Sequence, residues 1–290
     1  YQGIDIFHST GHLLPKLDNV RTVFTLHDLI PLLYPSYHKT LNRMFLRVMM
    51  PIFLRKADAI IAVSNNTKKD AIKHTNIDQS KIVVIPEAVS PSFHNITDEL
   101  HLDYVRNKYK LPKRFILCVS TIEPRKNHTT LLSAFERLQS DHPDLVLALA
   151  GRLGWLYEPI LKQIESSSSR HNVRLLGQVS DRDLPALLSA ATIFAFPSVY
   201  EGFGLPPLEA MACATPVVCS NTSSLPEVVG KAALMCDPFT IEAWHTQLNK
   251  LLLDKSLQDK HSKIGLSHSK KFSWNSVAIA TSQLYAKLLQ

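Results

Sequence analysis

The stretch SVYEGFGLPPLEAM, residues 198–211, places Glu201 and Glu209 on either side of a Gly-Phe-Gly turn and a Pro-Pro pair. The preceding apolar run predicts a strand, and the residues that follow predict a helix. Two carboxylates at such a junction can act as an acid and a base, or they can hold hydroxyl groups of a bound molecule. A carboxylate in the first helical turn, as expected for Glu209, can accept two hydrogen bonds from a ribose diol. The alternative for Glu209 is a favourable charge at a helix N-terminus.

Basic residues and glycines follow the other predicted strands. Arg125 and Lys126 lie side by side after a strand at 115–120 and directly before a helix. Positive charge there opposes the helix dipole, so a role in binding a diphosphate is favoured over a solvated pair. The loops after other strands contain Gly151, Gly177, Val179, Gly202 and Gly204. Because glycine lets backbone amides approach a phosphate closely, the set indicates a nucleoside-diphosphate site, with turn formation alone as the alternative for the glycines.

Short apolar runs alternate with helical patterns along the whole chain. Strands are predicted at 20–26, 58–64, 81–85 and 115–120, and in the segments LVLALAG, VRLLG, TIFAFPS and TPVVCS. Helices are predicted between them, and the stretch near 90–112 is predicted to be irregular. Continuous apolar strands that alternate with amphipathic helices are typical of parallel sheets covered on both faces. The sequence therefore predicts an α/β fold with two doubly wound domains, of which the first is incomplete.

The overall composition is that of a globular protein. The 290 residues are 45% hydrophobic and 20% charged, and their formal net charge of +7 suits an anionic partner such as a nucleotide or an acidic membrane. The positive charge is spread along the chain without interleaved aromatic residues, so a nucleic-acid partner is not expected. No leader pattern and no apolar window of about 18 residues is found, so we expect a cytoplasmic protein. The four cysteines have no CxxC spacing and are predicted to be reduced core thiols.

Two patterns resemble metal sites but are predicted to be structural. Asp181-Arg182-Asp183 looks like a metal-binding DxD motif, yet it precedes LPALLSA, where acidic residues are expected to cap a helix. His8 and His12 are four residues apart, but the intervening Gly11 and a strand-to-loop setting argue against a zinc helix. The chain contains no Walker loop and no GxGxxG motif. We therefore expect no metal ion and no cofactor.

The segment EGFGLPPLEA, with seven residues between its two glutamates, resembles the signature of retaining glycosyltransferases of family 4, which have the GT-B fold. The resemblance extends over nearly the whole chain. FTLHDLIPLLYP, ADAIIAVSNNTKKD and KIVVIP are similar to the second half of the family's acceptor domain, and EPRKN, LALAG, LLGQVSDRDLPALLSAATIFAFPS and TPVVCSNTSSLPEVVG to its donor domain.

The resemblance implies two Rossmann-like domains that face a cleft. The expected organisation is a partial acceptor-side domain at 1–95, a linker at 96–112, a nucleotide-sugar donor domain at 113–272 and a C-terminal helix at 273–290. That last helix is expected to pack back toward the first domain.

The family pattern also implies roles for individual residues. Glu209 would hold the ribose of the donor, and Glu201 with nearby amides would hold the sugar and the phosphate. Arg125 and Lys126 would neutralise the leaving diphosphate. The implied donor-binding positions are Gly151, Val179, Gly202, Phe203, Gly204, Leu205 and Glu209, with the backbone of Val179 facing the base.

His27 follows a predicted strand of the acceptor domain. The resemblance implies that it lines the cleft near the reacting sugar and belongs to the catalytic set with Arg125, Lys126 and Glu201. The alternative is that His27-Asp28 simply caps the next segment.

The chain departs from the family pattern at three places. Thr121 replaces an arginine five residues before Lys126, which makes the role of Arg125 less secure. Glu87-Ala88 replaces a common Asn-Gly pair. The family's first βα units, with a glycine-rich loop, are absent before Tyr1, so the chain is expected to be a fragment at its N-terminus.

The implied reaction is the metal-independent transfer of a hexose from a nucleoside-diphosphate sugar to a glycan or lipid-linked acceptor, with retention. Fixed cations and backbone donors at the phosphate would supply most of the catalysis. Retention is expected on one face of the sugar, with the leaving phosphate helping to deprotonate the acceptor. GDP-mannose is favoured over UDP-glucose because HDLIPLLYP is similar to mannosyltransferase-like members. The alternatives are another GT-B enzyme, such as a sugar-nucleotide epimerase or a phosphorylase, and a nucleotide-sugar-binding chain without turnover.

The predicted helix LNRMFLRVMMPIFLRK, residues 41–56, combines apolar bulk with the basic residues Arg43, Arg47, Arg55 and Lys56. This composition suits peripheral contact with the inner face of an anionic cytoplasmic membrane that carries a lipid-linked acceptor. A buried interdomain helix is the alternative.

Overall fold

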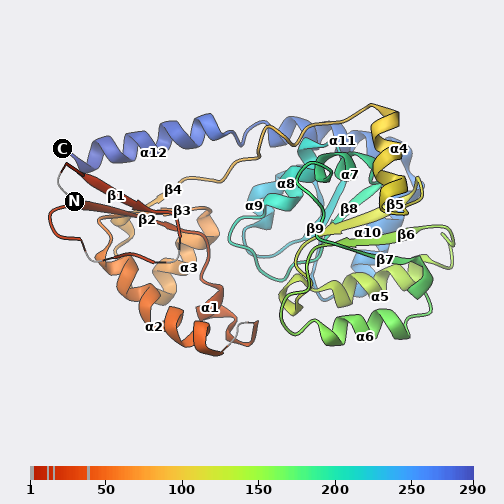
Figure 1. Cartoon of the computed structure of the whole chain (residues 1–290), viewed down its shortest axis with the longest axis horizontal. Helices are drawn as coiled ribbons and strands as arrows, with labels where there is room; N and C mark the ends of the chain where they lie inside the picture. The colour runs from red at the N-terminus through yellow and green to blue at the C-terminus, as the bar shows by residue number, and fades with distance from the viewer. Residues whose placement is uncertain (1–2, 12, 16, 38–39) are drawn as a thin grey trace. The chain divides into compact units, whose positions relative to one another are not determined.

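The computed structural model describes residues 3–11, 13–15, 17–37 and 40–290, with the side chains of 37 and 40–43 also outside the description. These residues form two compact units (Figure 1). The first unit consists of Tyr1–Ala88, Glu201–Phe203 and Phe272–Gln290, and the second of Val89–Tyr200 and Gly204–Lys271. The signature segment is therefore divided between the two units after Phe203.

The first unit is built on a four-stranded parallel sheet (Figure 1). Its strands lie in the order β1-β2-β3-β4, with bounds Ile6–Ser9, Arg21–Leu26, Ala59–Ala62 and Ile82–Val84. Its helices are α1 (Ile30–Leu33), α2 (Thr40–Lys56), α3 (Asn65–Thr75) and α12 (Trp274–Leu288). Helices α2 and α3 cover one face of the sheet, and α12 covers the other.

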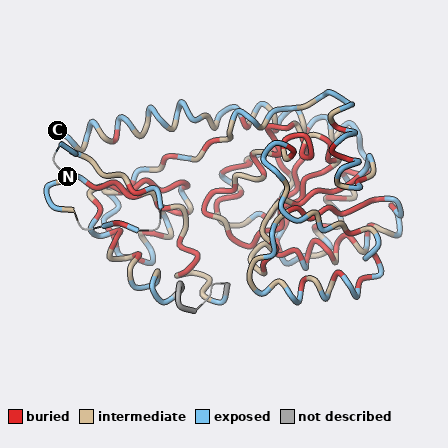
Figure 2. The backbone as a smooth tube through the Cα atoms, viewed as in Figure 1, coloured by how far each residue is buried: buried red, intermediate tan, exposed pale blue. Residues whose placement is uncertain are grey.

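The alternation of side chains along the central strands produces these two layers. Phe24 and Ile60 pack toward α2 and α3, whereas their neighbours Val23 and Ile61 pack toward α12. Each of the four side chains is at most 4% exposed. Strands buried on both faces read as continuous apolar runs, which is why their sequences predict a parallel sheet. Figure 2 shows these strands in the colour of buried residues.

The second unit is built on a six-stranded parallel sheet in the order β10-β9-β8-β5-β6-β7. The strands are β5 (Phe115–Val119), β6 (Val146–Ala150), β7 (Val173–Gly177), β8 (Ile193–Phe196), β9 (Val217–Ser220) and β10 (Leu234–Cys236). The order reverses between β5 and β8, as in doubly wound nucleotide-binding sheets. Ligands of such sheets bind at the carboxyl ends of the strands beside this reversal, which we call the switch point.

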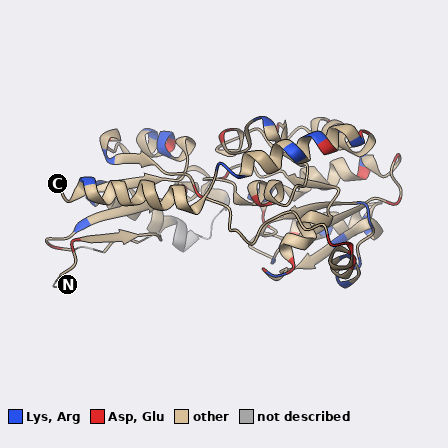
Figure 3. Ribbon diagram, turned by 90° about the horizontal axis from the view of Figure 1, so that it is seen from above, with Lys and Arg blue, Asp and Glu red and all other residues tan. Residues whose placement is uncertain are grey.

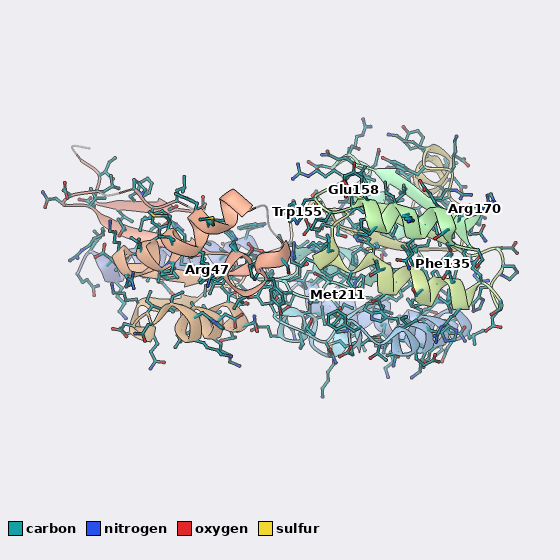
Figure 4. All side chains as sticks on the ribbon, turned by 90° about the horizontal axis from the view of Figure 1, so that it is seen from below. Arg47, Phe135, Trp155, Glu158, Arg170 and Met211 are labelled. Carbon is teal, nitrogen blue, oxygen red and sulfur yellow. The ribbon has the colours of Figure 1, made fainter. Side chains whose placement is uncertain are left out.

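Helices cover both faces of the second sheet. Their bounds are α4 (Glu99–Lys108), α5 (His128–Leu138), α6 (Glu158–Ser166), α7 (Leu184–Ala190), α8 (Leu205–Ala212), α9 (Leu225–Val229), α10 (Ile241–Leu253) and α11 (Lys255–Ser269). Helices α5, α6 and α10 share one core with the sheet, which includes Phe135 of α5 (Figure 4) and Trp244 of α10. Helices α7, α8 and α11 pack on the other face.

The predicted strands and the helices predicted between them are confirmed. Among the elements that were not individually predicted are the short strands β1 and β10 and the helix α4, which lies in the stretch near 90–112 that the sequence predicts to be irregular. That prediction was wrong because α4 has a weak apolar pattern, with Leu102 and Val105 as its buried apolar residues. Tertiary contacts with α7 complete its burial.

The positions of the charged residues and of the cysteines agree with the predictions made from the sequence. Lys and Arg are spread over many helices and loops (Figure 3). Cys118, Cys213, Cys219 and Cys236 are free and buried, as predicted. Burial raises the pKa of the Cys118 thiol to about 12, so this thiol remains protonated at neutral pH.

Candidate active site

Arg125 lies in the loop after β5, in a short 3₁₀ turn at Pro124–Lys126. Its Nη1 donates to the carbonyl of Tyr200 at 2.7 Å, and its Nη2 donates to Oε1 of Glu123 at 2.8 Å. Glu123 is only 1% exposed. The charge of Arg125 is therefore balanced by a buried carboxylate before any substrate binds.

The same loop fixes the chain after β8. The amide of Val199 donates to the carbonyl of Arg125 at 2.9 Å, and the hydroxyl of buried Ser198 lies within 3.4 Å of the carbonyls of Arg125 and Tyr200. Arg125, which is itself held by Glu123, thus fixes residues 198–200 by hydrogen bonds. These residues lead directly into half-buried Glu201. The resemblance implies that Arg125 neutralises the leaving diphosphate; in this structure its guanidinium also positions the loop through Tyr200.

Lys126 is half-buried, and its Nζ lies 5.2 Å from the centroid of the Phe196 ring. The neighbouring His128 is fully buried, with Nε2 at 3.1 Å from the hydroxyl of Ser120. Burial, with a smaller contribution from the charge of Lys126, lowers the pKa of His128 to about 4. His128 is therefore neutral at pH 7, and Lys126 supplies the positive charge at this end of β5.

The N-terminus of α8 lies at the switch point, after β8. Gly204 is its N-cap, with φ of 118°, and Leu205 is its first residue. The first turn of a helix has backbone N–H groups without partners inside the helix, but proline has no N–H. Because Pro206 and Pro207 follow and the amide of Leu208 makes the first hydrogen bond inside the helix, the amide donors at this end of α8 are those of Gly204 and Leu205.

Glu209 is the fifth residue of α8, so the prediction that it lies in the first helical turn was wrong. The helix begins at Leu205 because Gly204 adopts the left-handed conformation that caps it. Burial, and secondarily the charge of Asp181, raises the pKa of Glu209 to about 7. No cation pairs with this carboxylate among the described residues. Hydroxyl donors, such as a ribose diol, would stabilise its ionised form.

Gly151 and Val179 follow the neighbouring strands β6 and β7. Gly151 has φ of 149°, and a Cβ there would lie 2.0 Å from the carbonyl oxygen of Ser120. Only glycine therefore lets the loop after β6 approach the end of β5 so closely. Val179 is half-buried in the loop after β7. The structure thus brings Lys126, Gly151, Val179, Gly204, Leu205 and Glu209 to the carboxyl edge of one sheet.

Gly202 and Phe203 belong to the first unit. The carbonyl of Gly202 accepts hydrogen bonds from the hydroxyls of Ser64 at 2.6 Å and Thr67 at 3.0 Å. A Cβ on Gly202 would lie 1.8 Å from the carbonyl oxygen of His27, so the position excludes any larger residue. The buried ring of Phe203 meets Phe272 edge-on, with centroids 5.8 Å apart.

His27 follows β2 at the carboxyl edge of the first sheet. Its Nδ1 lies 2.9 Å from Oε1 of Glu87, and its Nε2 lies 3.0 Å from the carbonyl oxygen of Thr10. The hydrogen bond to Glu87 is the largest cause of a raised pKa for His27. At the start of α1 it is Asp28, and not His27, whose side chain makes a local bond: its Oδ1 accepts from the amide of Ile30 at 2.9 Å, while Leu29 is the N-cap.

A cavity of about 230 Å³ opens beside His27 in the first unit. Its walls are mainly apolar, with Ile61 and Ile85 of the sheet side and Trp274 of α12 among them. Its polar lining includes His27 and Glu87. Such a mixed surface fits a sugar ring, which has apolar faces and polar edges.

Sequence reasoning missed several residues that shape these sites. Glu123 lies inside the EPRKN motif itself, yet only the fold shows that its carboxylate faces Arg125. Ser64 has a detectable signal, because it precedes a helical pattern and caps α3 by accepting from the amide of Thr67. Glu87 was noted only as a departure, and nothing in its sequence context pairs it with His27.

Asp183 has structural contacts, but the prediction that the acids of Asp181-Arg182-Asp183 cap the following helix was wrong for Asp183, the residue at the cap position. Asp183 is the residue before α7, yet its side chain makes no capping hydrogen bond. It accepts instead from Nζ of Lys108 at 2.6 Å and from the hydroxyl of Tyr109 at 2.8 Å, which the unpredicted helix α4 places there. Across residues 3–290, apart from the few positions left undescribed, no three His, Cys, Asp or Glu side chains gather to hold a metal ion. The lookalike position His12 lies outside the described residues.

Two family models match the chain in the order of its two halves. One, described as Glycosyltransferase Family 4, matches residues 1–93, and the other, described as Glycosyl transferases group 1, matches residues 104–267. The gap between the matches, residues 94–103, includes the first half of α4.

Individual relatives agree with these models. O-antigen chain mannosyltransferase B of Escherichia coli is 36% identical over 287 residues, which are 98% of this chain and 74% of that protein. Serotype-specific mannosyltransferase WbdA of E. coli is 38% identical over 94% of this chain, which spans only 34% of that relative's length. Sucrose-phosphate synthase from Thermosynechococcus elongatus has the same fold, with a TM-score of 0.81 at 24% identity, covering 94% of this chain and 69% of that one.

Proposed function

We propose the donor, acceptor and mechanism of this chain, which belongs to the glycosyl transferases group 1 family, has the GT-B fold and is a glycosyltransferase that moves a hexose to a glycan acceptor. We propose that the hexose is mannose, taken from GDP-mannose with retention of configuration and without a metal ion. The mannosyl assignment is supported by the name of the E. coli O-antigen chain mannosyltransferase B, with which the chain shares 36% identity. By the same argument, the acceptor is the end of a growing polysaccharide.

The observation that carries the proposed donor site is the placement of Glu209 and Lys126 at one switch point. Glu209 has a raised pKa and no described cation beside it, so two ribose hydroxyls can donate to it. Lys126 and the amides of Gly204 and Leu205 supply positive charge and donors for a diphosphate. The two ends of a nucleoside diphosphate thus have complementary groups in the second unit.

In the proposed mechanism the anomeric carbon exchanges one oxygen for another on the same face. The bond from that carbon to the phosphate oxygen breaks, the acceptor oxygen forms the new bond, and its proton passes to the leaving phosphate. Negative charge grows on the diphosphate as it leaves, so preorganised donors at Lys126 and at the start of α8 lower the barrier. This charge stabilisation supports the proposal that no metal ion is required.

A donor panel tests this function. Purified protein is incubated with GDP-mannose, UDP-glucose and UDP-galactose, with and without a mannan oligosaccharide, in buffer containing EDTA. We expect acceptor-dependent GDP release and a product whose new linkage is α by NMR. Conversion of the donor to an epimer without acceptor would indicate an epimerase. Donor binding without release of nucleotide would indicate a binding protein, and either result would overturn the proposal.

Helix α2 supports a second part of the proposal, contact with an anionic membrane surface. Its inner face, with Met50, Phe53 and Leu54, is buried in the first unit. Met44, Phe45 and Val48 are exposed, and Arg47 projects from the same helix (Figure 4). Exposed apolar side chains beside basic residues are typical of helices that lie on membranes. The side chain of Arg43 lies outside the described residues, and no described helix is long and apolar enough to span a bilayer.

Vesicle sedimentation tests the membrane contact. We expect the chain to pellet with phosphatidylglycerol vesicles and not with phosphatidylcholine vesicles, and the bound fraction to fall as salt is raised. The double variant M44S/V48S should lose most of this binding while its thermal melting temperature stays within about 2 °C. Equal binding to both vesicle types, or no binding, would contradict the proposal.

A further inference from the structure

Both ring nitrogens of His27 face groups that can only accept a hydrogen bond. Nδ1 lies 2.9 Å from the carboxylate of Glu87, and Nε2 lies 3.0 Å from the backbone carbonyl of Thr10. A neutral imidazole carries one N–H and one acceptor nitrogen, so it satisfies only one of these contacts. The imidazolium carries two N–H groups and satisfies both.

Three loops at the carboxyl edge of the first sheet create this arrangement. Thr10 follows β1, His27 follows β2, and Glu87 follows β4. The backbone of His27 is held as well, because its carbonyl lies against Gly202 and accepts from the hydroxyl of Thr67 at 3.4 Å. The ring is therefore fixed by its side-chain contacts and by the main chain to which it is attached.

The other titratable groups around His27 favour the same protonation state or stay neutral. Asp28, the next residue, adds a smaller attraction for a positive ring. His8 of β1 lines the same cavity and contacts the hydroxyls of Tyr285 at 2.6 Å and Thr25 at 2.7 Å. Burial lowers the pKa of His8, so it adds no competing charge at neutral pH.

We propose that Glu87 is a positioning residue for the transfer reaction, which holds His27 with both ring nitrogens protonated and so removes it as a base. The inference rests on the proposed glycosyl transfer. Carboxylate and imidazolium form a pair without net charge, which orients the ring beside the cavity without opposing the positive charge that develops on the reacting sugar. The proton of the acceptor hydroxyl then has to leave by another route, which is the departing phosphate oxygen.

The variant Glu87→Gln tests the proposal on the full chain. Glutamine keeps an oxygen that can accept from Nδ1 but removes the negative charge, so the fold should be retained. Glu158→Gln is the matched control, because Glu158 is exposed at the start of α6 and also loses one charge (Figure 4). Circular dichroism and thermal melting establish that both variants are folded.

The first readout is the ¹⁵N NMR titration of the His27 ring, assigned with the variant His27→Gln. We expect the wild-type ring to remain doubly protonated at pH 7 and Glu87→Gln to move its titration down by about one pH unit. The control should not move it. A wild-type ring that is neutral at pH 7, or a titration that Glu87→Gln leaves in place, would overturn the proposal. This readout needs no turnover, so it separates this proposal from the proposed function.

The second readout is kinetic. If Glu87 positions His27 for the transfer, Glu87→Gln lowers kcat by about tenfold and leaves the KM for GDP-mannose within about twofold. His27→Gln should cost no more than a comparable factor, because glutamine retains a donor. A loss of more than about 1,000-fold for His27→Gln, with a wild-type pH profile in which activity falls on the acid side as His27 is protonated, would show that His27 is a base after all and would overturn the assignment.

Discussion

Two carboxylates near the carboxyl edges of the two sheets have opposite surroundings. Glu87 in the first unit has its cation, because its Oε1 lies 2.9 Å from Nδ1 of His27. Glu209 in the second unit is half-buried, lies near the like charge of Asp181, and has no described cation beside it. The carboxylate of Glu87 has a hydrogen-bond partner in the free protein. The carboxylate of Glu209 would gain donors only from a bound ligand.

This difference predicts which of the two carboxylates contributes to ligand affinity. A buried carboxylate without a partner destabilises the free protein, and a ligand that satisfies it gains that free energy on binding. A paired carboxylate stabilises the free protein and contributes orientation. We therefore expect substitutions of Glu209 to act mainly on donor affinity, and those of Glu87 to act mainly on turnover.

The largest expected effect is on nucleotide binding. Glu209→Ala should raise the Kd for GDP by about 1,000-fold, since two charge-assisted hydrogen bonds are lost at about 2 kcal/mol each. Isothermal titration calorimetry measures the change, with Glu158→Gln as a control that should bind as the wild type does. Unchanged affinity in Glu209→Ala would remove this residue from the site.

The next effect concerns the ion pair between Glu123 and Arg125 in the second unit. It tests whether a carboxylate that is paired in the free protein stabilises the fold. Glu123→Gln leaves the buried guanidinium of Arg125 without its carboxylate, and should lower the free energy of unfolding by about 3 kcal/mol. Urea unfolding measures it. The double variant E123Q/R125M should recover part of the loss, because it removes the guanidinium whose buried carboxylate has been replaced. A double variant less stable than Glu123→Gln would show that the remaining contacts of Arg125, such as its hydrogen bond to the carbonyl of Tyr200, outweigh the cost of burying its charge.

A smaller effect has the opposite sign. The pKa of Glu209 is raised to about 7, so the ionised side chain costs stability above that pH, and the cost disappears as pH falls below the ordinary value. Glu209→Gln should therefore raise the free energy of unfolding by on the order of 2 kcal/mol at pH 8, and by less at pH 5. Urea unfolding at the two pH values checks this. A variant destabilised at pH 8 would mean that the carboxylate has a partner.

The smallest effect is the pH dependence of donor affinity. Below pH 7 the free protein holds Glu209 protonated, and nucleotide binding must ionise it. The Kd for GDP should therefore rise by about tenfold between pH 8 and pH 6. Calorimetry in buffers of different ionisation enthalpy should show proton release on binding near pH 6. The Kd of the variant Glu209→Gln should not change over this pH range. A wild-type Kd that is equally independent of pH would contradict the assignment of Glu209 to the ribose.

Local sequence predicted most of the architecture correctly. The parallel strands, the main helices and the α/β class follow from continuous apolar runs and helical periodicity, and the GT-B fold followed from motif order. Helix α4 was missed because its apolar pattern is weak. The capping of α7 by Asp183 was wrong because Lys108 and Tyr109, more than 70 residues away, offer its carboxylate better partners.

The candidate site was predictable in its residue types and less so in its pairings. Adjacent basic residues at Arg125 and Lys126 look equivalent in sequence, but one is paired with buried Glu123 and the other is not part of that pair. Glu209 was expected in the first turn of α8 and is its fifth residue, just beyond that turn, because the helix begins at Leu205, directly after Gly204.

The sequence by itself determined the class of fold, the order of the strands along the chain and the residue types available at the strand ends, because these depend on local periodicity and composition. Only the tertiary structure decided which charges are already balanced. Ion pairs such as His27 with Glu87 join residues 60 positions apart, and the desolvation that raises the pKa of Glu209 depends on everything packed around α8. Pairing and burial are properties of neighbours in space, and neighbours in space are set by the fold.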